Sequence, residues 1–212
     1  VKEVQAAVLD GRADFAVHSA KDLPSVEVAG LVIAAVPARG ECRDALVGST
    51  LADLRPGALV ATGSVRRRAQ LAWLRPDLTF TGLRGNIATR LSKAGDYAAI
   101  VMAAAALERL GLADRAAEVL EPDVMLPQVG QGALAIEARL DDEDTLVALA
   151  GIEDGASRRE LDAERGFLAE LGGDCDLPAG ALARMGASGK LELEGLLASL
   201  DDADDPLDAP PG

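Results

Sequence analysis

The sequence has few of the residues on which several common classes of function depend. Its 212 residues include only five aromatic side chains, which leaves little surface on which nucleic-acid bases could stack. The net charge of −14 also argues against nucleic acid as a partner of the whole chain. One histidine and two cysteines are too few for a histidine-based zinc site or a disulfide framework. No apolar run reaches roughly eighteen residues, the length that a membrane-spanning helix needs.

The composition is that of a globular protein. Hydrophobic residues make up 49% of the chain and charged residues 26%, a balance unlike that of disordered or fibrous proteins. The length predicts one large domain or two to three small ones. The chain opens at Val1 within a helical pattern and without an initiator methionine. We therefore expect that upstream sequence is missing, so the absence of a targeting signal carries little weight.

Charge is distributed unevenly along the chain. Residues 1–139 hold sixteen basic and sixteen acidic side chains, whereas residues 140–212 hold five basic and nineteen acidic ones and carry the whole net charge. Within the neutral part, residues 55–93 hold eight basic side chains against one acid, Asp77. This basic segment is either a solvated surface, which is the usual fate of a charge run, or a site for an anion.

Apolar runs alternate with helical patterns along the chain. Strand patterns occupy residues 15–19, 31–36, 45–48, 58–62, 78–81, 98–103 and 132–137. Helical patterns occupy residues 1–9, 65–74, 87–93, 104–110, 114–120 and 144–171, the last with a break at 151–155. Such alternation predicts βαβ units around a parallel sheet, and hence an α/β fold. Shorter alternating runs from residue 180 onward predict a small antiparallel piece.

Two predicted helix starts carry a charge that an isolated helix disfavours. Each follows a strand pattern, has a capping residue (Ser64 or Asn86) and holds arginines in or beside its first turn, where the helix dipole is already positive. The arginines are Arg66, Arg67, Arg68, Arg84 and Arg90. Two such starts at the carboxyl edge of a parallel sheet favour an anion site over a solvated surface. Guanidinium groups match carboxylates, and neither a Walker motif nor GxGxxG is present, so carboxylates are favoured over phosphates.

A second cluster of polar residues, at residues 18–24, follows the strand pattern at 15–19. Pro24 restrains the residue before it, so Lys21 and Asp22 sit on a rigid edge. A carboxylate held there could accept N–H groups from a ligand or stabilise a cation that forms on it. Taken alone, however, the motif favours a Lys–Asp pair in an Asp-x-Pro turn. His18, the only histidine, is more typical of a structural group than of a ligand.

Cys175 lies in a glycine-rich loop after the long helical pattern, where a thiol is accessible to a reaction partner. Asp174 and Asp176 flank it and should disfavour the thiolate. The loop by itself leaves an incidental cysteine and a functional one equally open.

The chain holds five motifs whose order and spacing are those of one enzyme family. They are His18-Ser19-x-Lys21-Asp22-x-Pro24, Thr62-Gly63-Ser64-Val65-Arg66-Arg67, Leu83-Arg84-Gly85-Asn86-x-x-Thr89-Arg90-Leu91-x-Lys93, Val129-Gly130-Gln131-Gly132-Ala133 and the Cys175 loop. Together they resemble porphobilinogen deaminase, also called hydroxymethylbilane synthase, from Val1 to about Leu200. The resemblance implies that a first strand and helix, and the end of the C-terminal domain, are missing. We therefore expect little turnover from these 212 residues alone.

The resemblance also implies an activity and a set of site residues. The family is a transferase that joins four porphobilinogen molecules head to tail into hydroxymethylbilane, with release of ammonia, on a covalent dipyrromethane cofactor. A thioether would join this cofactor to Cys175, and Asp22 would be the catalytic carboxylate and a cofactor contact. The other residues expected to bind the cofactor are Lys21, Thr62, Ser64, Arg66, Arg67, Arg84, Arg90 and Gln131. Each pyrrole carries one acetate and one propionate, which accounts for the arginines at the helix starts; no metal is expected.

The fold that the resemblance implies has two α/β domains like those of periplasmic binding proteins, with a cleft between them, and a small α+β C-terminal domain. Domain 1 would comprise residues 1–37 and 132–150, domain 2 residues 38–131, and the C-terminal domain residues 151–212. A cytoplasmic monomer without nucleic-acid or membrane partners is expected. Two alternatives stay open: a carboxylate-binding protein of the periplasmic type without catalysis, and an inactive truncated product.

Overall fold

The computed structural model describes residues 1–172, 177–186 and 188–199. This part of the chain divides into two compact units. Unit 1 comprises residues 1–42, 128–172 and the described part of 181–195, and unit 2 comprises residues 43–127, 177–180 and 196–199. The separate C-terminal domain expected from residue 151 onward stays a prediction. No helix among the described residues is both long and apolar enough to cross a bilayer.

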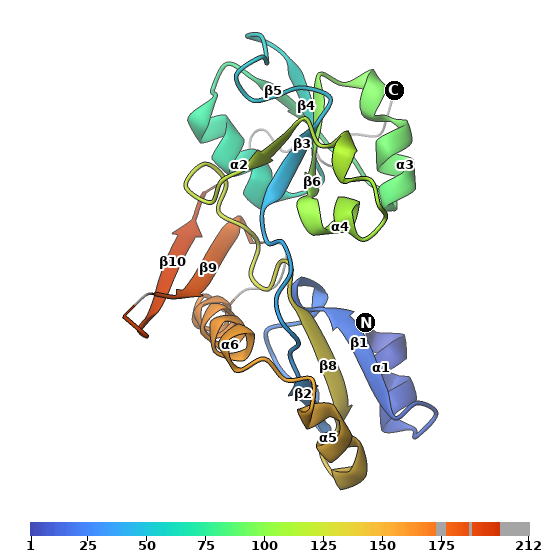
Figure 1. Cartoon of the computed structure of the whole chain (residues 1–212). Helices are drawn as coiled ribbons and strands as arrows, with labels where there is room; N and C mark the ends of the chain where they lie inside the picture. Colours follow the sequence, from blue (N-terminus) through green and yellow to red (C-terminus); the bar gives the residue numbers. More distant parts are fainter. Residues whose placement is uncertain (173–176, 187, 200–212) are drawn as a thin grey trace. The chain divides into compact units, whose positions relative to one another are not determined.

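Unit 1 is built on a three-stranded antiparallel sheet of order β1-β8-β2. The strands are β1 (Phe15–Ser19), β2 (Leu31–Ala35) and β8 (Leu134–Arg139). Strand β8 returns from the second half of the chain to lie between the two N-terminal strands (Figure 1), with Glu137 opposite both Ala16 and Ile33. The helix α1 (Lys2–Leu9) contacts β1, and α5 (Glu143–Ala150) contacts β2.

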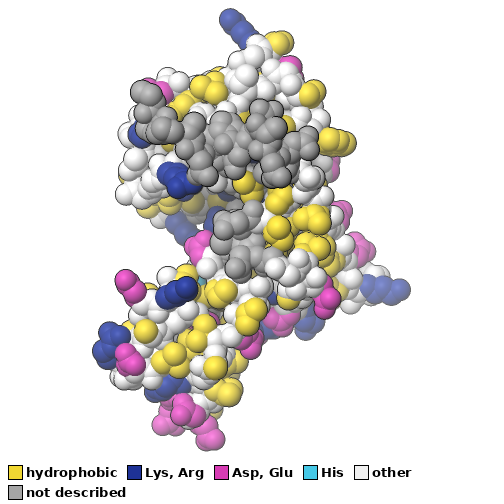
Figure 2. All heavy atoms as spheres, turned by 180° about the vertical axis from the view of Figure 1, so that it is seen from behind, with side chains coloured by type: hydrophobic (Ala, Val, Ile, Leu, Met, Phe, Trp, Pro, Cys, Tyr) yellow, Lys and Arg dark blue, Asp and Glu magenta, His cyan; other side chains and the backbone are white. Residues whose placement is uncertain are grey.

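The rest of unit 1 is a long helix and most of a two-stranded sheet. Helix α6 (Gly155–Glu170) is separated from α5 by the break expected at 151–155, and its first turn is capped by Asp154, which accepts a hydrogen bond from Ser157 N at 2.8 Å. Strands β9 (Ala179–Met185) and β10 (Leu191–Leu197) pair with each other. The acidic run 141–144 is largely exposed at the start of α5, and Figure 2 shows acidic side chains gathered at the bottom of the view, where Figure 1 places α5.

Unit 2 contains a five-stranded sheet of order β5-β4-β6-β3-β7. Its strands are β3 (Asp44–Val47), β4 (Leu59–Ala61), β5 (Thr79–Thr81), β6 (Ala99–Ala103) and β7 (Glu118–Leu120). Its helices are α2 (Val65–Leu74), α3 (Ile87–Ser92) and α4 (Ala104–Glu108). Strands β4, β5 and β6 are parallel, as the βαβ alternation predicts, whereas β3 is antiparallel to both of its neighbours.

Helices cover both faces of the unit 2 sheet. On one face, Leu71 of α2 packs with Leu46 of β3. On the other, Leu91 of α3 and Leu107 of α4 pack with Val47. Neighbouring residues of β3 thus point to opposite buried faces, which is the arrangement of a central strand between two helix layers. The expected α/β class is confirmed.

The helix expected at residues 114–120 is wrong. A single 3₁₀ turn, Ala113–Arg115, is followed by strand β7. Leu120 of this strand is buried opposite Asp44, so backbone pairing to β3 and packing outweigh the weak local helical spacing.

Candidate functional site

The residues predicted to bind a carboxylate gather at one edge of the unit 2 sheet. The carboxyl ends of β4 and β5 lead into the loops that begin α2 and α3, and the antiparallel β3 starts at the same edge with Asp44 opposite Ala103, the last residue of β6. This is the edge at which open α/β sheets place their ligands.

The loop before α2 is held by its own hydroxyl groups. Thr62 Oγ1 accepts a hydrogen bond from Ser64 N at 3.2 Å, and Ser64 Oγ accepts one from Arg67 N at 3.4 Å, so Ser64 is the N-cap that the sequence predicts. Each hydroxyl still has its proton to donate. A Cβ at Gly63 would lie 2.8 Å from the carbonyl oxygen of Leu83, so only glycine allows the loops before α2 and α3 to approach this closely.

The start of α3 brings a second cation to this edge. Asn86 caps the helix through a 2.9 Å hydrogen bond from Thr89 N, as predicted, and Arg90 donates through Nε to the carbonyl oxygen of Gly85 at 2.8 Å. Burial lowers the pKa of Arg90, and the charge of Arg67 lowers it further. The pKa of Arg90 thus responds to an arginine of the other helix start, while Arg84 is exposed in the segment before α3.

Arg66 and Arg67 turn inward rather than outward. Both are buried, and both bind Asp44, whose side chain is fully buried: Arg66 Nη2 lies 2.7 Å from Oδ2, and Arg67 Nη2 lies 2.8 Å from Oδ1. Burial raises the pKa of Asp44, but the charges of the two arginines and their hydrogen bonds outweigh this effect and hold the pKa well below its usual range. Asp44 was not predicted from the sequence. The one feature that could have indicated it is an acidic residue directly before the apolar run Ala45-Leu46-Val47.

Three further predicted site residues lie in unit 1. Lys21 and Asp22 belong to a 3₁₀ turn, Ala20–Asp22, directly after β1. Lys21 Nζ donates to Gln131 Oε1 at 3.2 Å, and Gln131 Nε2 donates to the carbonyl oxygen of Cys42 at 2.8 Å. Gly130 allows the segment that carries Gln131 to approach the 3₁₀ turn of Lys21 this closely. It has φ of +71°, and a Cβ there would lie 3.0 Å from Lys21 N. The side chain of Asp22 is exposed.

His18 occupies the structural setting that the sequence favours. It is buried, and its Nε2 lies 3.0 Å from Glu137 Oε2. Gln5 Nε2 donates a hydrogen bond to the same Glu137 oxygen at 2.9 Å. Among the described residues no group of histidine, cysteine and acidic side chains could hold a metal ion. Cys175 and Asp174 lie outside the described residues.

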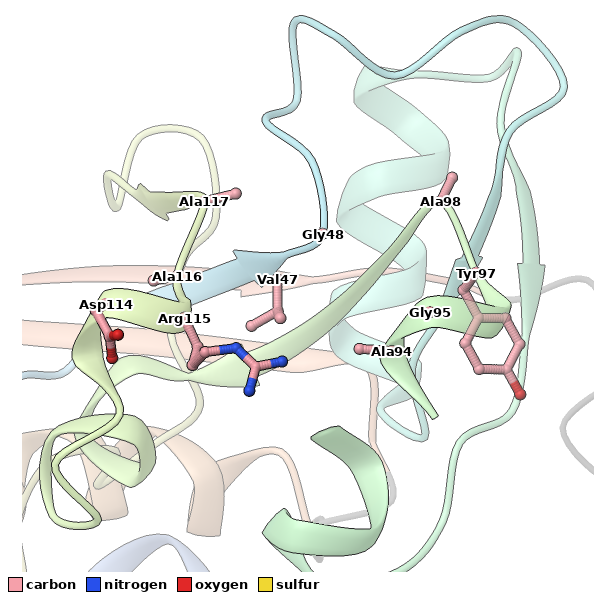
Figure 3. Close-up of a pocket in the computed structure, with 10 residues that line it drawn as sticks. All are labelled: Val47, Gly48, Ala94, Gly95, Tyr97, Ala98, Asp114, Arg115, Ala116 and Ala117. Carbon is pink, nitrogen blue, oxygen red and sulfur yellow. The ribbon is translucent and has the colours of Figure 1, made fainter. Parts of the chain in front are cut away.

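A cavity of about 510 Å³ in unit 2 lies away from these residues (Figure 3). It is lined by the ends of β3 and β6 opposite to Asp44 and by the turns around Tyr97 and Arg115. It contains none of the residues predicted from the motifs.

Comparison with known proteins supplies an independent result. The family model described as "Porphobilinogen deaminase, dipyromethane cofactor binding domain" matches residues 1–147, and the model "Porphobilinogen deaminase, C-terminal domain" matches residues 159–207. The chain is 52% identical over 206 residues to the porphobilinogen deaminase of Roseiflexus sp. (strain RS-1), covering 95% of this chain and 68% of that protein. It is 45% identical over 207 residues to that of Bacillus subtilis (strain 168), covering 95% and 66%. A putative methionine-binding lipoprotein from Bacillus subtilis aligns with a TM-score of 0.46 and 17% identity over 72% of this chain and 74% of that one.

Proposed function

Because the chain belongs to the porphobilinogen deaminase family, we propose that it joins four porphobilinogen molecules head to tail into hydroxymethylbilane. Each step releases ammonia and forms a carbon–carbon bond between two pyrrole units, so the activity is that of a transferase. The observation that carries this proposal is the family match along 95% of the chain, with the motif residues Thr62, Ser64, Arg67 and Arg90 gathered at one sheet edge. The family match does not favour the alternative of a ligand-binding protein without catalysis. We also propose that the protein acts as a cytoplasmic monomer.

The residues of the described chain fit a dipyrromethane cofactor. This group carries two acetates and two propionates, and the edge of unit 2 offers cations to match: the pKa of Arg90 is lowered by burial and by the neighbouring Arg67. An anion placed there would relieve the repulsion between the two guanidinium groups. Among the described residues, Arg66 Nε is also a buried donor without an acceptor. When bound, the cofactor supplies the free α-carbon on which the chain of pyrroles is built.

Each site residue has a role that its setting allows. Asp22 is exposed after β1, where its carboxylate can accept a pyrrole N–H and stabilise the positive charge that develops on the ring as ammonia leaves. Lys21, which precedes Asp22 in the same 3₁₀ turn, donates a hydrogen bond to Gln131 and would add a positive charge to the cofactor site. Cys175 would carry the cofactor as a thioether, and the arginines, Thr62 and Ser64 would hold its carboxylates.

Intact-mass measurement tests the proposal directly. The protein should carry a covalent two-pyrrole adduct, and the Cys175→Ala variant should lose it completely. The matched control is Cys42→Ala, which should keep the adduct because burial raises the pKa of the half-buried Cys42 thiol and so disfavours its reaction. An active protein whose cysteines are all unmodified would refute the proposal.

Removal of one anchoring charge should change the distribution of products. In the Arg84→Ala variant we expect short pyrrole oligomers to stay on the protein and tetrapyrrole release to fall, because a growing polycarboxylate loses one partner. Mass spectrometry of the protein during turnover reads the oligomer lengths. Arg68→Ala is the control, since Arg68 matches no binding position of the family. An unchanged oligomer distribution in Arg84→Ala would mean that Arg84 does not bind the growing pyrrole chain.

A further inference from the structure

Asp44 is a fully buried carboxylate at the sheet edge where α2 begins. Its two oxygens take different partners: Oδ2 accepts from Arg66 Nη2 at 2.7 Å, and Oδ1 accepts from Arg67 Nη2 at 2.8 Å and Nε at 3.1 Å. The backbone on either side of the carboxylate is fixed, since Asp44 pairs with Ala103 of β6 and Leu120 of β7. The carboxylate is therefore a rigid point between two guanidinium groups.

The two arginines are also bound at their far ends. Arg66 Nη1 donates to the carbonyl oxygen of Leu126 at 2.5 Å, and Arg67 Nη1 donates to that of Val101 at 3.3 Å. Each planar guanidinium thus has contacts on two sides, so its orientation is determined and not only its charge. Asp44 is the common partner that fixes the two planes relative to each other.

Fold stability alone does not account for this arrangement. Replacement of a whole buried ion group by apolar residues is often neutral or stabilising, so a triad of this kind is weak evidence for stability. Asp44 instead supplies from β3 the negative charge that the first turn of α2 lacks, at positions where the helix dipole disfavours arginine. Asp44, Arg66 and Arg67 together carry one net positive charge. This charge acts on Arg90, because the charge of Arg67 lowers the pKa of Arg90.

We propose that Asp44 is a positioning residue: it holds Arg66 and Arg67 in the one arrangement that binds the carboxylates of a pyrrole acetate–propionate ligand. This inference rests on the proposed function and adds to it a residue that contacts no ligand itself. Without the Asp44 carboxylate, the two like charges would repel each other and move apart, and the ligand would lose a preformed partner.

The test measures affinity for a pyrrole acetate–propionate that lacks the aminomethyl group and so cannot react. Calorimetry is done in a Cys175→Ala background, in which no covalent cofactor occupies the arginines. It should show roughly a 10- to 100-fold weaker affinity when Asp44→Asn is added, the size of effect expected when an orienting partner is removed. Asp77→Asn is the matched control, because Asp77 pairs with Arg75 at 2.7 Å on the surface of the same unit; its affinity should not change. In turnover, Asp44→Asn should raise KM more than it lowers kcat.

A double-substitution cycle separates positioning from any other role. In a protein that already carries Arg66→Met and Arg67→Met, the addition of Asp44→Asn should weaken affinity no further, because its effect passes through the arginines. A further loss of similar size in that background, or an unchanged or tighter affinity in the single variant, would overturn the proposal.

A charge-free triad keeps the test decisive if Asp44→Asn alone does not fold. The variant with Asp44→Leu, Arg66→Met and Arg67→Met leaves no buried charge unpaired and should unfold close to the temperature of the unsubstituted protein. Its affinity should equal that of the double arginine variant, and an affinity close to that of the unsubstituted protein would overturn the proposal. Absence of the adduct and of probe binding in the unsubstituted protein would instead refute the proposed function.

Discussion

Replacement of Asp22 by asparagine is expected to lower the rate of pyrrole condensation by about 10²- to 10⁴-fold without a change in fold. The amide keeps the size of the side chain but removes the negative charge that stabilises the developing cation on the pyrrole. Asp22 is exposed in the 3₁₀ turn after β1, so its replacement leaves no buried group without a partner. The loss should therefore appear in the rate and not in stability.

The rate is best measured in a single turnover with cofactor-loaded protein, alongside thermal unfolding. Asp14→Asn is the control, since Asp14 is an exposed carboxylate that precedes the same strand; its rate should stay within about twofold of the unsubstituted protein. A rate for Asp22→Asn in that same range would remove Asp22 from catalysis, whereas a loss of rate that accompanies unfolding would assign it to structure.

Local features of the fold were predictable because their causes lie within a few residues. Ser64 and Asn86 cap α2 and α3 as predicted, since a capping side chain bonds a backbone N–H three residues ahead. The break between α5 and α6 follows from the run Gly151–Gly155, and buried strands such as β6 follow from uninterrupted apolar residues.

Features that depend on distant residues were not predictable in the same way. The sequence patterns show where strands and helices alternate. They do not show whether β3 runs parallel or antiparallel to its neighbours in the sheet. Asp44 lies 22 residues before Arg66 in the chain, so neither the excess of basic residues in 55–93 nor the helix starts reveals that an internal carboxylate binds two of those arginines. The motifs predict which residues form the site, and the structure shows which contacts the described ones make.

The largest expected effect on stability comes from Glu164, which the sequence did not single out. Its carboxylate is fully buried in unit 1 and binds the guanidinium of Arg39, with Nη1 2.6 Å from Oε1. It also accepts backbone hydrogen bonds from Gly130 N at 2.7 Å and Ala183 N at 2.9 Å. One side chain thus joins α6 to the segments before β3 and β8 and to β9.

Glu164→Ala should lower the free energy of unfolding by about 3–5 kcal/mol, because it leaves the buried guanidinium of Arg39 and two buried N–H groups without their acceptor. Urea unfolding measures the difference, with Glu170→Ala as the control: Glu170 is exposed at the end of the same helix, and its loss should cost less than about 0.5 kcal/mol. The effect should also reach the site, since Gly130 precedes Gln131, the partner of Lys21. If Glu164→Ala lowers the free energy of unfolding by less than about 1 kcal/mol, water or another group replaces the carboxylate. Glu164 would then not be what holds these segments together.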